Sequence, residues 1–335
     1  MKHILPILIL ALLSWPCDGG RARSPSAAGE HIAWGETSFA DPTLWKGTDN
    51  RYYALATPGG HPAGARYLTS DDALTWTRMA TGPFDAATAA AIKRDWKNVW
   101  APDCAVVKGK RLLYVTLYNS AEDSAVGVFT LDGDAGQARD LRILTRSKET
   151  GIRDTIDPEV VTDPQTKRTW LFFGSVGMMH RIELTADGLA VKPGAQYVHV
   201  AGRTDRENPK RDRVFEGAYL HRHGGWWYLF VSAGWYADAT YNLRVGRSRK
   251  LDGVFTDREG RPMTEGFSTP VLGTEGDFYG PGHNGDVLVG KDGVARIYYH
   301  CHWKGTDRDG QSPRIMLCRR LVWGKDGWPT TVKGK

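Results

Sequence analysis

Cysteine is scarce in this chain, and no second apolar run follows the one at its start. Only 4 of the 335 residues are cysteine, and three of them lie beyond residue 100: Cys104, Cys301 and Cys318. Three cysteines cannot all pair, which excludes a fold held together mainly by disulfides. Cys301 and Cys318 could bridge on neighbouring strands, or all three could be buried thiols. Beyond residue 13, no apolar run is long enough for a membrane-spanning helix.

Concentrated positive charge is also missing. The formal net charge of +6 comes from lysines and arginines that are scattered along the chain. The densest stretch, 203–213, also contains Asp205, Glu207 and Asp212. Because there is no basic helical face and no groove-reading motif, nucleic acid is not an expected partner.

The first residues have the pattern of a secretory signal peptide. A basic start precedes the apolar segment 4–13, which is too short to span a bilayer. We therefore expect residues 1–22 to be a signal peptide and 23–30 a flexible leader, and the mature protein to be secreted or periplasmic. A surface lipoprotein anchored through Cys17 is the weaker alternative, because the tryptophan and proline before this cysteine fit such a signal poorly.

Helical patterns are almost absent, apart from an alanine-rich segment at 85–96. A short aromatic strand that follows a turn recurs instead. Five such strands are expected, at 51–56, 111–116, 168–173, 226–231 and 295–300. Their spacing of roughly 55 to 70 residues is typical of a β-propeller. We therefore predict an all-β fold, a five-bladed β-propeller, as one domain over residues 31–335. The expected blades are about 31–95, 96–150, 151–205, 206–270 and 271–335.

One polar residue of catalytic type precedes each aromatic strand. These residues are Asp41, Asp103, Asp157, Glu216 and His283. The first strand of each propeller blade lines the central axis, so we expect the five side chains to converge on one pocket. An Asp-Pro pair alone usually marks a turn. Four acids at the same offset in four successive blades indicate an active site instead.

Several carboxyl groups in one pocket of low dielectric constant cannot all ionise at their usual pKa values. One of them keeps its proton near neutral pH while another stays charged. Hydrolysis of a glycosidic bond requires such an acid and such a base, held apart by their surroundings. A sialidase fits less well, because no axial position offers an arginine cluster or a tyrosine nucleophile.

The short motifs around these residues resemble those of glycoside hydrolase family 43, the five-bladed arabinanases, arabinofuranosidases and β-xylosidases. The motifs are Phe39-Ala40-Asp41-Pro42, Trp100-Ala101-Pro102-Asp103, Ile156-Asp157-Pro158, Glu216-Gly217-Ala218-Tyr219 and Gly280-Pro281-Gly282-His283. The resemblance implies that Asp41 is the general base and Glu216 the general acid, and that Asp157 orients the acid and modulates it electrostatically. It also implies inversion at the anomeric carbon, with the two catalytic carboxyls about 6.5–9.5 Å apart.

The same resemblance leaves two roles open for His283. In arabinanases the corresponding histidine lies beside a calcium or similar ion that is held largely by water. Imidazole is not a usual ligand for a hard cation, so a histidine hydrogen-bonded near the substrate is the alternative. Candidate substrate-binding residues are Trp100 and Phe39, through their aromatic faces, and Asp103. Asp103 could instead hold the start of its strand.

The expected substrate is an arabinose-containing polysaccharide or oligosaccharide. Segment 241–266 resembles arabinan endo-1,5-α-L-arabinanases, which favours this activity. However, Phe39-Ala40 replaces the usual histidine before the base, and Glu216-Gly217-Ala218 departs from the usual Glu-Ala-Pro. An exo-acting α-L-arabinofuranosidase, or a related furanosidase or β-xylosidase, is therefore the second hypothesis. A non-catalytic carbohydrate-binding propeller is the third. We expect a monomer that needs no organic cofactor.

Overall fold

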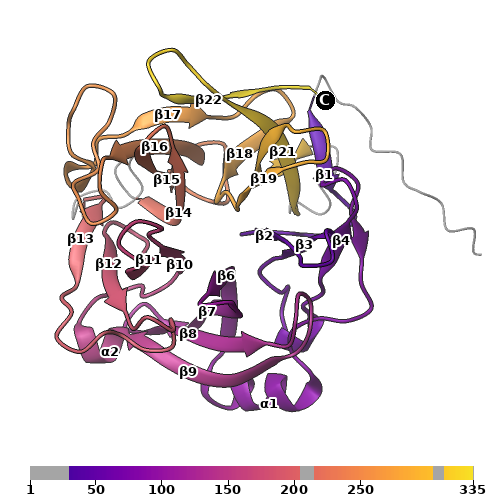
Figure 1. Ribbon diagram of the computed structural model, residues 1–335. Helices are drawn as coiled ribbons and strands as arrows, with labels where there is room; N and C mark the ends of the chain where they lie inside the picture. The colour runs from indigo at the N-terminus through magenta and orange to yellow at the C-terminus, as the bar shows by residue number, and fades with distance from the viewer. Residues whose placement is uncertain (1–29, 204–214, 305–312, 335) are drawn as a thin grey trace, which may run out of the picture.

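Five antiparallel sheets surround a central axis in the computed structural model, which describes residues 30–203, 215–304 and 313–334 (Figure 1). Blade 1 consists of β2 (Thr43–Lys46), β3 (Tyr52–Leu55), β4 (Leu68–Ser70) and β5 (Thr77–Arg78). Blade 2 consists of β6 (Asn98–Val107), β7 (Lys110–Ser120), β8 (Asp123–Leu131) and β9 (Ala138–Arg146). Blade 3 consists of β10 (Glu159–Thr162), β11 (Thr169–Phe173), β12 (Met179–Leu184) and β13 (Val198–Ala201).

The remaining two blades complete the ring of sheets. Blade 4 consists of β14 (Phe215–His223), β15 (Trp226–Ala233), β16 (Asn242–Ser248) and β17 (Thr269–Leu272). Blade 5 consists of β18 (Phe278–Gly282), β19 (Val287–Val289), β20 (Ala295–Trp303), β21 (Arg314–Trp323), β22 (Pro329–Val332) and β1 (His31–Trp34). The predicted five-bladed, all-β fold is confirmed. Each predicted aromatic strand lies next to the inner strand of its blade, as β3, β7, β11, β15 or β20.

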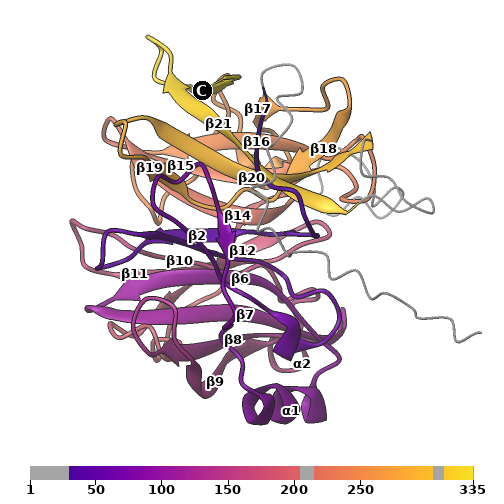
Figure 2. The same cartoon turned by 90° about the vertical axis from the view of Figure 1, so that its right-hand side faces the viewer.

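Helices contribute little to the described part of the chain. The helix α1 (Ala86–Asp95) begins after Asp85, whose Oδ1 accepts a hydrogen bond from the Thr88 N–H at 2.7 Å. It confirms the predicted helix at 85–96 and lies at the outer edge beyond β9 (Figures 1 and 2). The others are α2 (Ser147–Thr150) and the 3₁₀ turns η1 (Pro62–Gly64) and η2 (Met263–Glu265). No helix among the described residues is long and apolar enough to cross a membrane.

The first strand of the chain closes the last blade. In this blade β1 pairs with β21, with His31 opposite Cys318 and Ile32 opposite Leu317. The predicted start of blade 1 at residue 31 is therefore wrong. A local sequence pattern cannot reveal this pairing, because it joins the two ends of the chain. Pairing of this kind removes the two open edges that an unclosed ring of blades would leave.

The propeller begins one residue earlier than predicted. Glu30, assigned to the leader, is buried and pairs with the Arg319 guanidinium in β21, so it belongs to the propeller. The predicted signal peptide and the rest of the leader lie outside the described residues.

Cys104, Cys301 and Cys318 are all free and buried. Cys301 faces Ile315 and Cys318 faces Tyr298 across the ladder, which agrees with the buried-thiol alternative.

Hydrophobic side chains fill each junction between neighbouring blades. Five clusters of buried residues are present, one for each pair of adjacent blades. The cluster between blades 5 and 1, for example, contains Trp34 from β1, Leu44 from β2 and Tyr298 from β20. Burial of these apolar surfaces is the main stabilising contribution to the arrangement of the blades. The polar side chains are left to meet along the axis.

The chain bends sharply where each inner strand approaches the axis. One residue per blade has a left-handed backbone there: Asp41 (φ 53°), Ala101 (φ 39°), Asp157 (φ 56°), Gly217 (φ 61°) and His283 (φ 41°). Left-handed conformations are costly for residues other than glycine and concentrate at functional sites. These five equivalent positions are here called the axial bends. Asp41, Asp157 and His283 are themselves axial bends, whereas Asp103 lies two residues after the bend of its blade and Glu216 lies one residue before the bend of its blade.

A second layer of side chains, the axial ring, links the blades in a closed circle. Its members are Thr43, Asp103, Glu159, Tyr219 and Asp286. Each accepts a hydrogen bond from a backbone N–H of the next blade. The donors, in the same order, are Cys104 (3.1 Å), Val160 (2.8 Å), Leu220 (2.9 Å), Val287 (2.9 Å) and Leu44 (2.8 Å). The ring thus satisfies five buried donors and fixes the blades at the level just below the axial bends.

The three carboxyl groups of the axial ring favour their neutral form. Burial and the nearby Asp286 raise the pKa of Asp103 well above its usual value. Burial, Asp103 and Asp286 do the same for Glu159. Burial raises the pKa of Asp286 to about 6. The folded protein therefore binds protons here more tightly than the unfolded chain. Its stability should be greatest at low pH with respect to these groups, and should fall as the pH rises through their folded-state values.

Substitution of Glu159 tests this protonation. Glu159→Gln keeps an acceptor for the Leu220 N–H and mimics a neutral carboxyl, so we expect the free energy of unfolding at pH 7 to change little. Glu159→Leu leaves the buried N–H without an acceptor and should cost about 1–3 kcal/mol. Urea unfolding of both variants gives the comparison. Equal destabilisation by glutamine and leucine would show that the folded protein needs a charged carboxylate at this position.

Candidate active site

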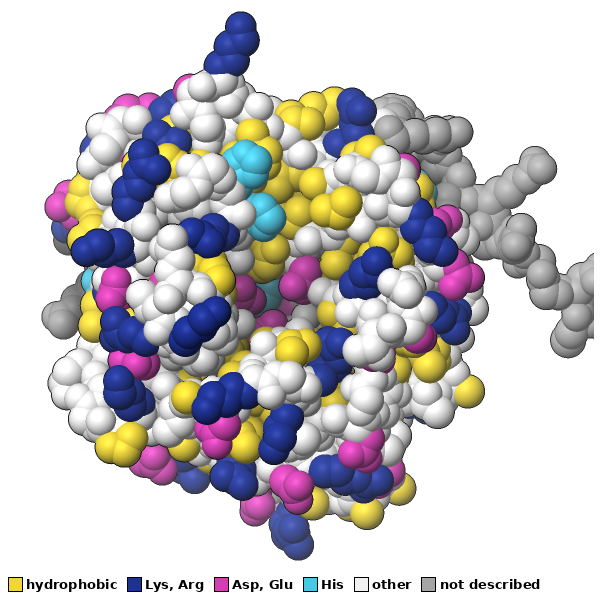
Figure 3. Space-filling view, in the orientation of Figure 1, with side chains coloured by type: hydrophobic (Ala, Val, Ile, Leu, Met, Phe, Trp, Pro, Cys, Tyr) yellow, Lys and Arg dark blue, Asp and Glu magenta, His cyan; other side chains and the backbone are white. Residues whose placement is uncertain are grey.

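Acidic and histidine side chains gather at one end of the axis. In the space-filling view, Asp, Glu and His side chains lie at the bottom of a central hollow, with lysines and arginines around it (Figure 3). The axial bends and the residues beside them supply these groups. Of the predicted site residues, the structure brings together Asp41, Asp157, Glu216 and His283. A β-bulge or irregularity accompanies the bend in blades 2, 4 and 5, as is common next to active sites.

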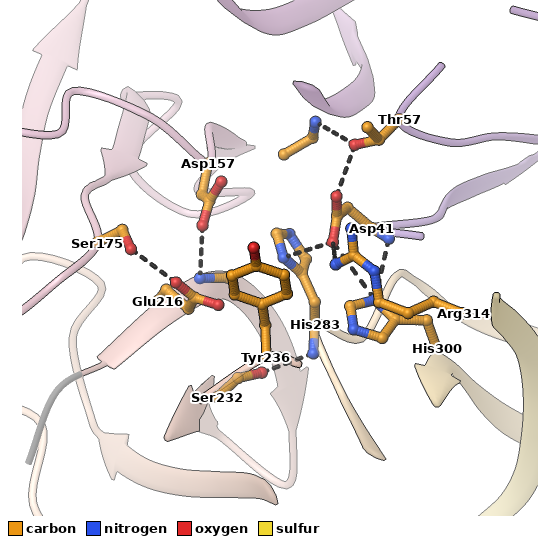
Figure 4. Close-up of polar contacts among 12 residues, drawn as sticks. Asp41, Thr57, Asp157, Ser175, Glu216, Ser232, Tyr236, His283, His300 and Arg314 are labelled. Carbon is orange, nitrogen blue, oxygen red and sulfur yellow. Dashed lines mark hydrogen bonds and ion pairs between the residues drawn. The ribbon is translucent and has the colours of Figure 1, made fainter. Parts of the chain in front are cut away.

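Asp41 lies among cationic and hydrogen-bonding groups (Figure 4). Its Oδ2 accepts a hydrogen bond from the Thr57 hydroxyl at 2.6 Å. Its Oδ1 is 3.2 Å from Nη1 of Arg314 and 3.2 Å from Nδ1 of His283. Burial alone would raise the pKa of Asp41, but Arg314 and His283 lower it well below the usual value. Asp41 is therefore a carboxylate at neutral pH, with oxygens held in fixed positions.

Two histidines support the Asp41 segment in different ways. His300, in β20, accepts a hydrogen bond from the Asp41 backbone N–H at its Nδ1, at 3.1 Å. Burial lowers the pKa of His300 to about 3, so its imidazole is neutral. The His283 backbone N–H donates to the Ser232 hydroxyl at 2.6 Å. The ring of His283 packs against Gly217, where a Cβ atom would lie only 3.0 Å from its Cγ. Gly217 thus combines a left-handed bend with close contact to this ring.

Glu216 accepts two short hydrogen bonds, one at each carboxyl oxygen. Ser175 Oγ donates to Oε2 at 2.6 Å, and the Tyr241 hydroxyl donates to Oε1 at 2.5 Å. The next residue, Gly217, donates its backbone N–H to Asp157 Oδ2 at 3.2 Å. This bond ties the Asp157 side chain to the turn that carries Glu216. Because Tyr241 is fully buried, its hydroxyl fixes the direction of the Glu216 carboxyl.

Asp157 favours its protonated form. Burial raises the pKa of Asp157 well above its usual value, and the charges of Glu216 and Asp41 raise it further. The site therefore has two unlike halves. Asp41 is held charged by Arg314 and His283, whereas the Asp157–Glu216 pair resists carrying two negative charges. Opposed environments of this kind allow one carboxyl to act as a base and another as an acid.

The described residues do not fit a directly ligated calcium ion at His283. Among them there is no group of three or more His, Cys, Asp or Glu side chains arranged to hold a metal. His283 Nδ1 is directed at Asp41, which agrees with the alternative of a hydrogen-bonded histidine. Calcium prefers six to eight oxygen ligands, and His283 offers none from its side chain. Calcium near His283 stays a prediction, and no step of the mechanism depends on it.

Asp103 lies apart from the other predicted site residues. Its Oδ2 accepts the Val160 N–H in the axial ring, and the side chain is 7% exposed. Because it lies two residues beyond the bend at Ala101, its side chain reaches the next layer along the axis. The predicted common offset of the four acids is therefore wrong for Asp103. Its placement favours the alternative that it holds the start of its strand, and a substrate contact stays untested.

The two aromatic candidates also differ. Trp100, in β6, is half-buried and packs against Tyr118 with ring centroids 4.4 Å apart, so part of its surface is accessible to a ligand. Phe39 is only 5% exposed and belongs to the cluster between blades 5 and 1. Its backbone N–H donates to the Arg314 carbonyl oxygen at 2.7 Å. Phe39 thereby couples the segment before Asp41 to β21, and its contact with a sugar stays a prediction.

Several residues of the site were not predicted from the sequence. They are Thr57, Ser175, Tyr236, Tyr241, His300 and Arg314. Arg314 is 273 positions from Asp41 in the chain, and its guanidinium lies 5.1 Å from the ring centroid of the exposed Tyr236. Figure 4 shows Tyr236 beside the groups that surround Asp41. No local motif marks these residues, because they reach the site only through the folding of blades 1, 3, 4 and 5.

Comparisons with known proteins agree with this geometry. The sequence model of glycosyl hydrolases family 43 matches residues 35–329. An extracellular endo-alpha-(1->5)-L-arabinanase of Bacillus subtilis is 29% identical over 316 residues, which covers 91% of this chain and 92% of the relative. An extracellular exo-alpha-(1->5)-L-arabinofuranosidase of Cellvibrio japonicus is 26% identical, with 86% and 85% covered.

A solved structure shares the fold. The alpha-L-arabinanase of Cellvibrio cellulosa, determined with arabinohexaose, superposes with a TM-score of 0.73 at 23% identity, over 89% of this chain and 96% of that one. At this identity the likeness concerns the fold alone. The family match, by contrast, spans all five blades and the residues of the axial bends. The chain therefore belongs to glycosyl hydrolases family 43 and is a glycoside hydrolase.

Proposed function

We propose that this enzyme hydrolyses α-L-arabinofuranosyl linkages in arabinan with inversion, and that it acts within the chain as an endo-1,5-α-L-arabinanase. The observation that carries the proposal is the contrast between the two halves of the site. Arg314 and His283 keep Asp41 charged, whereas burial and the charges of Glu216 and Asp41 favour the protonated form of Asp157. An inverting glycosidase needs a charged base and a protonated acid on opposite faces of the sugar.

Each carboxyl then has a defined task. Asp41 accepts a proton from a water molecule as that water attacks the anomeric carbon. The hydrogen bond from Thr57 and the contact with Arg314 hold the carboxylate in place for this transfer. Glu216 donates its proton to the glycosidic oxygen as the bond breaks. Asp157 positions Glu216 through the Gly217 N–H, and its own raised pKa keeps a second negative charge away from Glu216.

Endo action is favoured by the arrangement of aromatic rings. The Bacillus subtilis relative is named as an endo enzyme and the Cellvibrio japonicus relative as an exo enzyme, so the family match alone does not decide. In this chain, accessible aromatic pairs occur in two separate blades. Trp100 packs with Tyr118 in blade 2, and Trp235 packs with Tyr236 in the loop after β15. Pairs that flank the site could hold sugars on both sides of the cleaved bond.

Incubation with linear 1,5-arabinan tests the proposal. We expect a ladder of oligosaccharides early in the reaction, and the β-anomer as the first product in a proton NMR time course. Arabinose as the sole early product would establish the exo alternative. An α-anomer formed first would contradict inversion. Saturable binding without any released sugar would point to a carbohydrate-binding propeller.

The relatives also indicate where the enzyme acts. Both relatives named above are extracellular. Export to meet a polymer outside the cell is therefore part of the proposal, with residues 1–22 as the signal peptide. N-terminal sequencing of the secreted protein would identify the cleavage site. An intact Met1 in the secreted fraction would contradict it.

Chelation tests the calcium prediction for His283. Since the described side chains offer no set of three ligands, any ion near this histidine would be held mostly by water and would exchange readily. Treatment with EDTA followed by dialysis should then lower the rate of arabinan hydrolysis, and added calcium should restore it. Full activity after EDTA would show that His283 acts through its hydrogen bond to Asp41 alone. Magnesium serves as the control cation.

A further inference from the structure

A small pocket lies beside the candidate active site and shares a wall with it. Its volume is about 220 Å³, and it is formed by the segment before Asp41 and the loop that follows β3. Thr57 belongs to both sites, because it lines this pocket and donates its hydroxyl to Asp41 Oδ2 at 2.6 Å. Pockets for drug-sized ligands have roughly 300–1,000 Å³, so this one suits a ligand no larger than a single sugar ring.

The pocket combines an aromatic floor with hydroxyl groups. Trp34 and Phe39 both line it and are each 5% exposed, so their positions are fixed by the core beneath them. Thr37 and Ser38 contribute exposed hydroxyls, and the Trp34 indole N–H donates to Thr37 Oγ1 at 3.3 Å. An apolar floor with a few hydroxyl groups that orient the ligand is typical of small-molecule pockets.

Positive charge distinguishes this pocket from one for a neutral sugar. Arg66 and Arg78 line it, and no aspartate or glutamate does. Arg66 is held by its own loop, because Nη1 donates to the carbonyl oxygens of Ala63 and Ala65 at 2.6 and 2.7 Å. Within the described part of the chain, most other pocket-lining or surface arginines of blades 1 to 3 pair with a carboxylate, whereas these two do not. Guanidinium groups favour carboxylates, which they can bind through two parallel hydrogen bonds.

We propose that this pocket is a subsite for a uronic acid residue, a sugar that carries a carboxylate, next to the residue undergoing hydrolysis. The inference rests on the proposed function in one respect, namely that the uronate belongs to the same polysaccharide. The aromatic floor and hydroxyls receive the ring, and Arg66 and Arg78 receive the carboxylate. The enzyme would then recognise an acidic sugar near the arabinosyl linkage that it cleaves.

Calorimetric titration of the full chain with D-galacturonic acid tests the inference, with D-galactose and acetate as probes of the ring and of the charge. We expect galacturonate to bind at least tenfold more tightly than either. Arg78 is exposed at the end of β5, and its side chain makes no hydrogen bond to another described residue. Arg78→Gln should therefore weaken galacturonate binding tenfold or more without unfolding the protein. Arg142→Gln, an exposed arginine on the outer strand of blade 2, is the matched control and should bind like the unaltered enzyme.

Three results would overturn the inference. They are unchanged galacturonate binding in Arg78→Gln, binding of galactose as tight as that of galacturonate, and binding of acetate as tight as that of galacturonate. The titration does not depend on hydrolysis. An enzyme that fails to cleave arabinan but binds galacturonate through Arg78 would therefore contradict the proposed function and leave the pocket assignment standing.

Discussion

Replacing Glu216 with glutamine is expected to reduce hydrolysis of linear arabinan by about 10⁴-fold, the upper range for loss of general acid–base catalysis. Glutamine has nearly the same shape and its carbonyl oxygen can still accept one of the hydrogen bonds from Ser175 and Tyr241, but it has no acidic proton to give. On 4-nitrophenyl α-L-arabinofuranoside the loss should be much smaller, because nitrophenolate leaves without protonation. Reducing-sugar release and nitrophenol absorbance provide the two rates.

Replacing Asp41 supplies the matching half of this test. Asp41→Asn removes the base, so both substrates should lose activity to a similar extent, whatever their leaving group. Glu216→Ala and Asp41→Ala are expected to be inactive on arabinan, with thermal unfolding close to that of the unaltered enzyme. Glu216→Gln with ordinary activity on arabinan would exclude Glu216 as the acid. A larger loss on the nitrophenyl substrate for Glu216→Gln than for Asp41→Asn would reverse the two roles.

Substitution of Arg314 should have the second-largest effect. Its guanidinium, 3.2 Å from Asp41 Oδ1, helps to hold the pKa of Asp41 well below its usual value. In Arg314→Met this pKa should rise, and the acidic limb of the kcat/KM profile should move to higher pH, because that limb reports the base in the free enzyme. We also expect kcat to fall by about 10- to 100-fold as the carboxylate loses one of its fixed partners.

The sign of the stability change distinguishes this effect from general damage. A carboxyl whose folded-state pKa is lowered stabilises the folded protein above its unfolded value, and this contribution is lost as the pH falls. Arg314→Met should therefore lose stability at neutral pH and approach the unaltered enzyme in acid. Arg314→Lys should restore part of the acidic limb. Arg139→Met, which removes a surface arginine paired with Asp85, should change neither profile. An acidic limb unmoved in Arg314→Met would rule out this role.

The sequence was sufficient for the blades and for most of the catalytic set, because both depend on local patterns. Aromatic residues recur in the strand beside the inner strand of each blade, and a short polar turn precedes each of these strands. The motifs that contain Asp41, Asp157, Glu216 and His283 are short and continuous. Counting residues back from the aromatic strand gave the wrong position for Asp103, because the backbone bulges there. The irregularity between Trp100 and Asp103 places Asp103 in the axial ring, although its distance from the next strand resembles that of Asp41.

The same local patterns could not predict contacts between residues that are distant in the sequence. Arg314 contacts Asp41 only after blades 5 and 1 have come together. Thr57 and Tyr241 reach the catalytic carboxyls from 16 and 25 residues away, once blades 1 and 4 have folded. The pairing of β1 with β21 is of the same kind. Nothing in the sequence near His31 distinguishes a strand that opens blade 1 from one that completes blade 5. Such pairings depend on which edges remain open once the other sheets have formed.

The pairing of β1 with β21 also makes the two ends of the propeller neighbours in space. Glu30 lies 3.4 Å from Lys333 when measured between Oε1 and Nζ. A short linker could therefore join them and turn the chain into a covalent circle. New ends could then be opened in an exposed turn such as 193–194, which precedes the outer strand of blade 3. Such a circular permutant would keep all five blades and the whole catalytic end. The order of the blades along the chain is thus a property of where the circle happens to be cut.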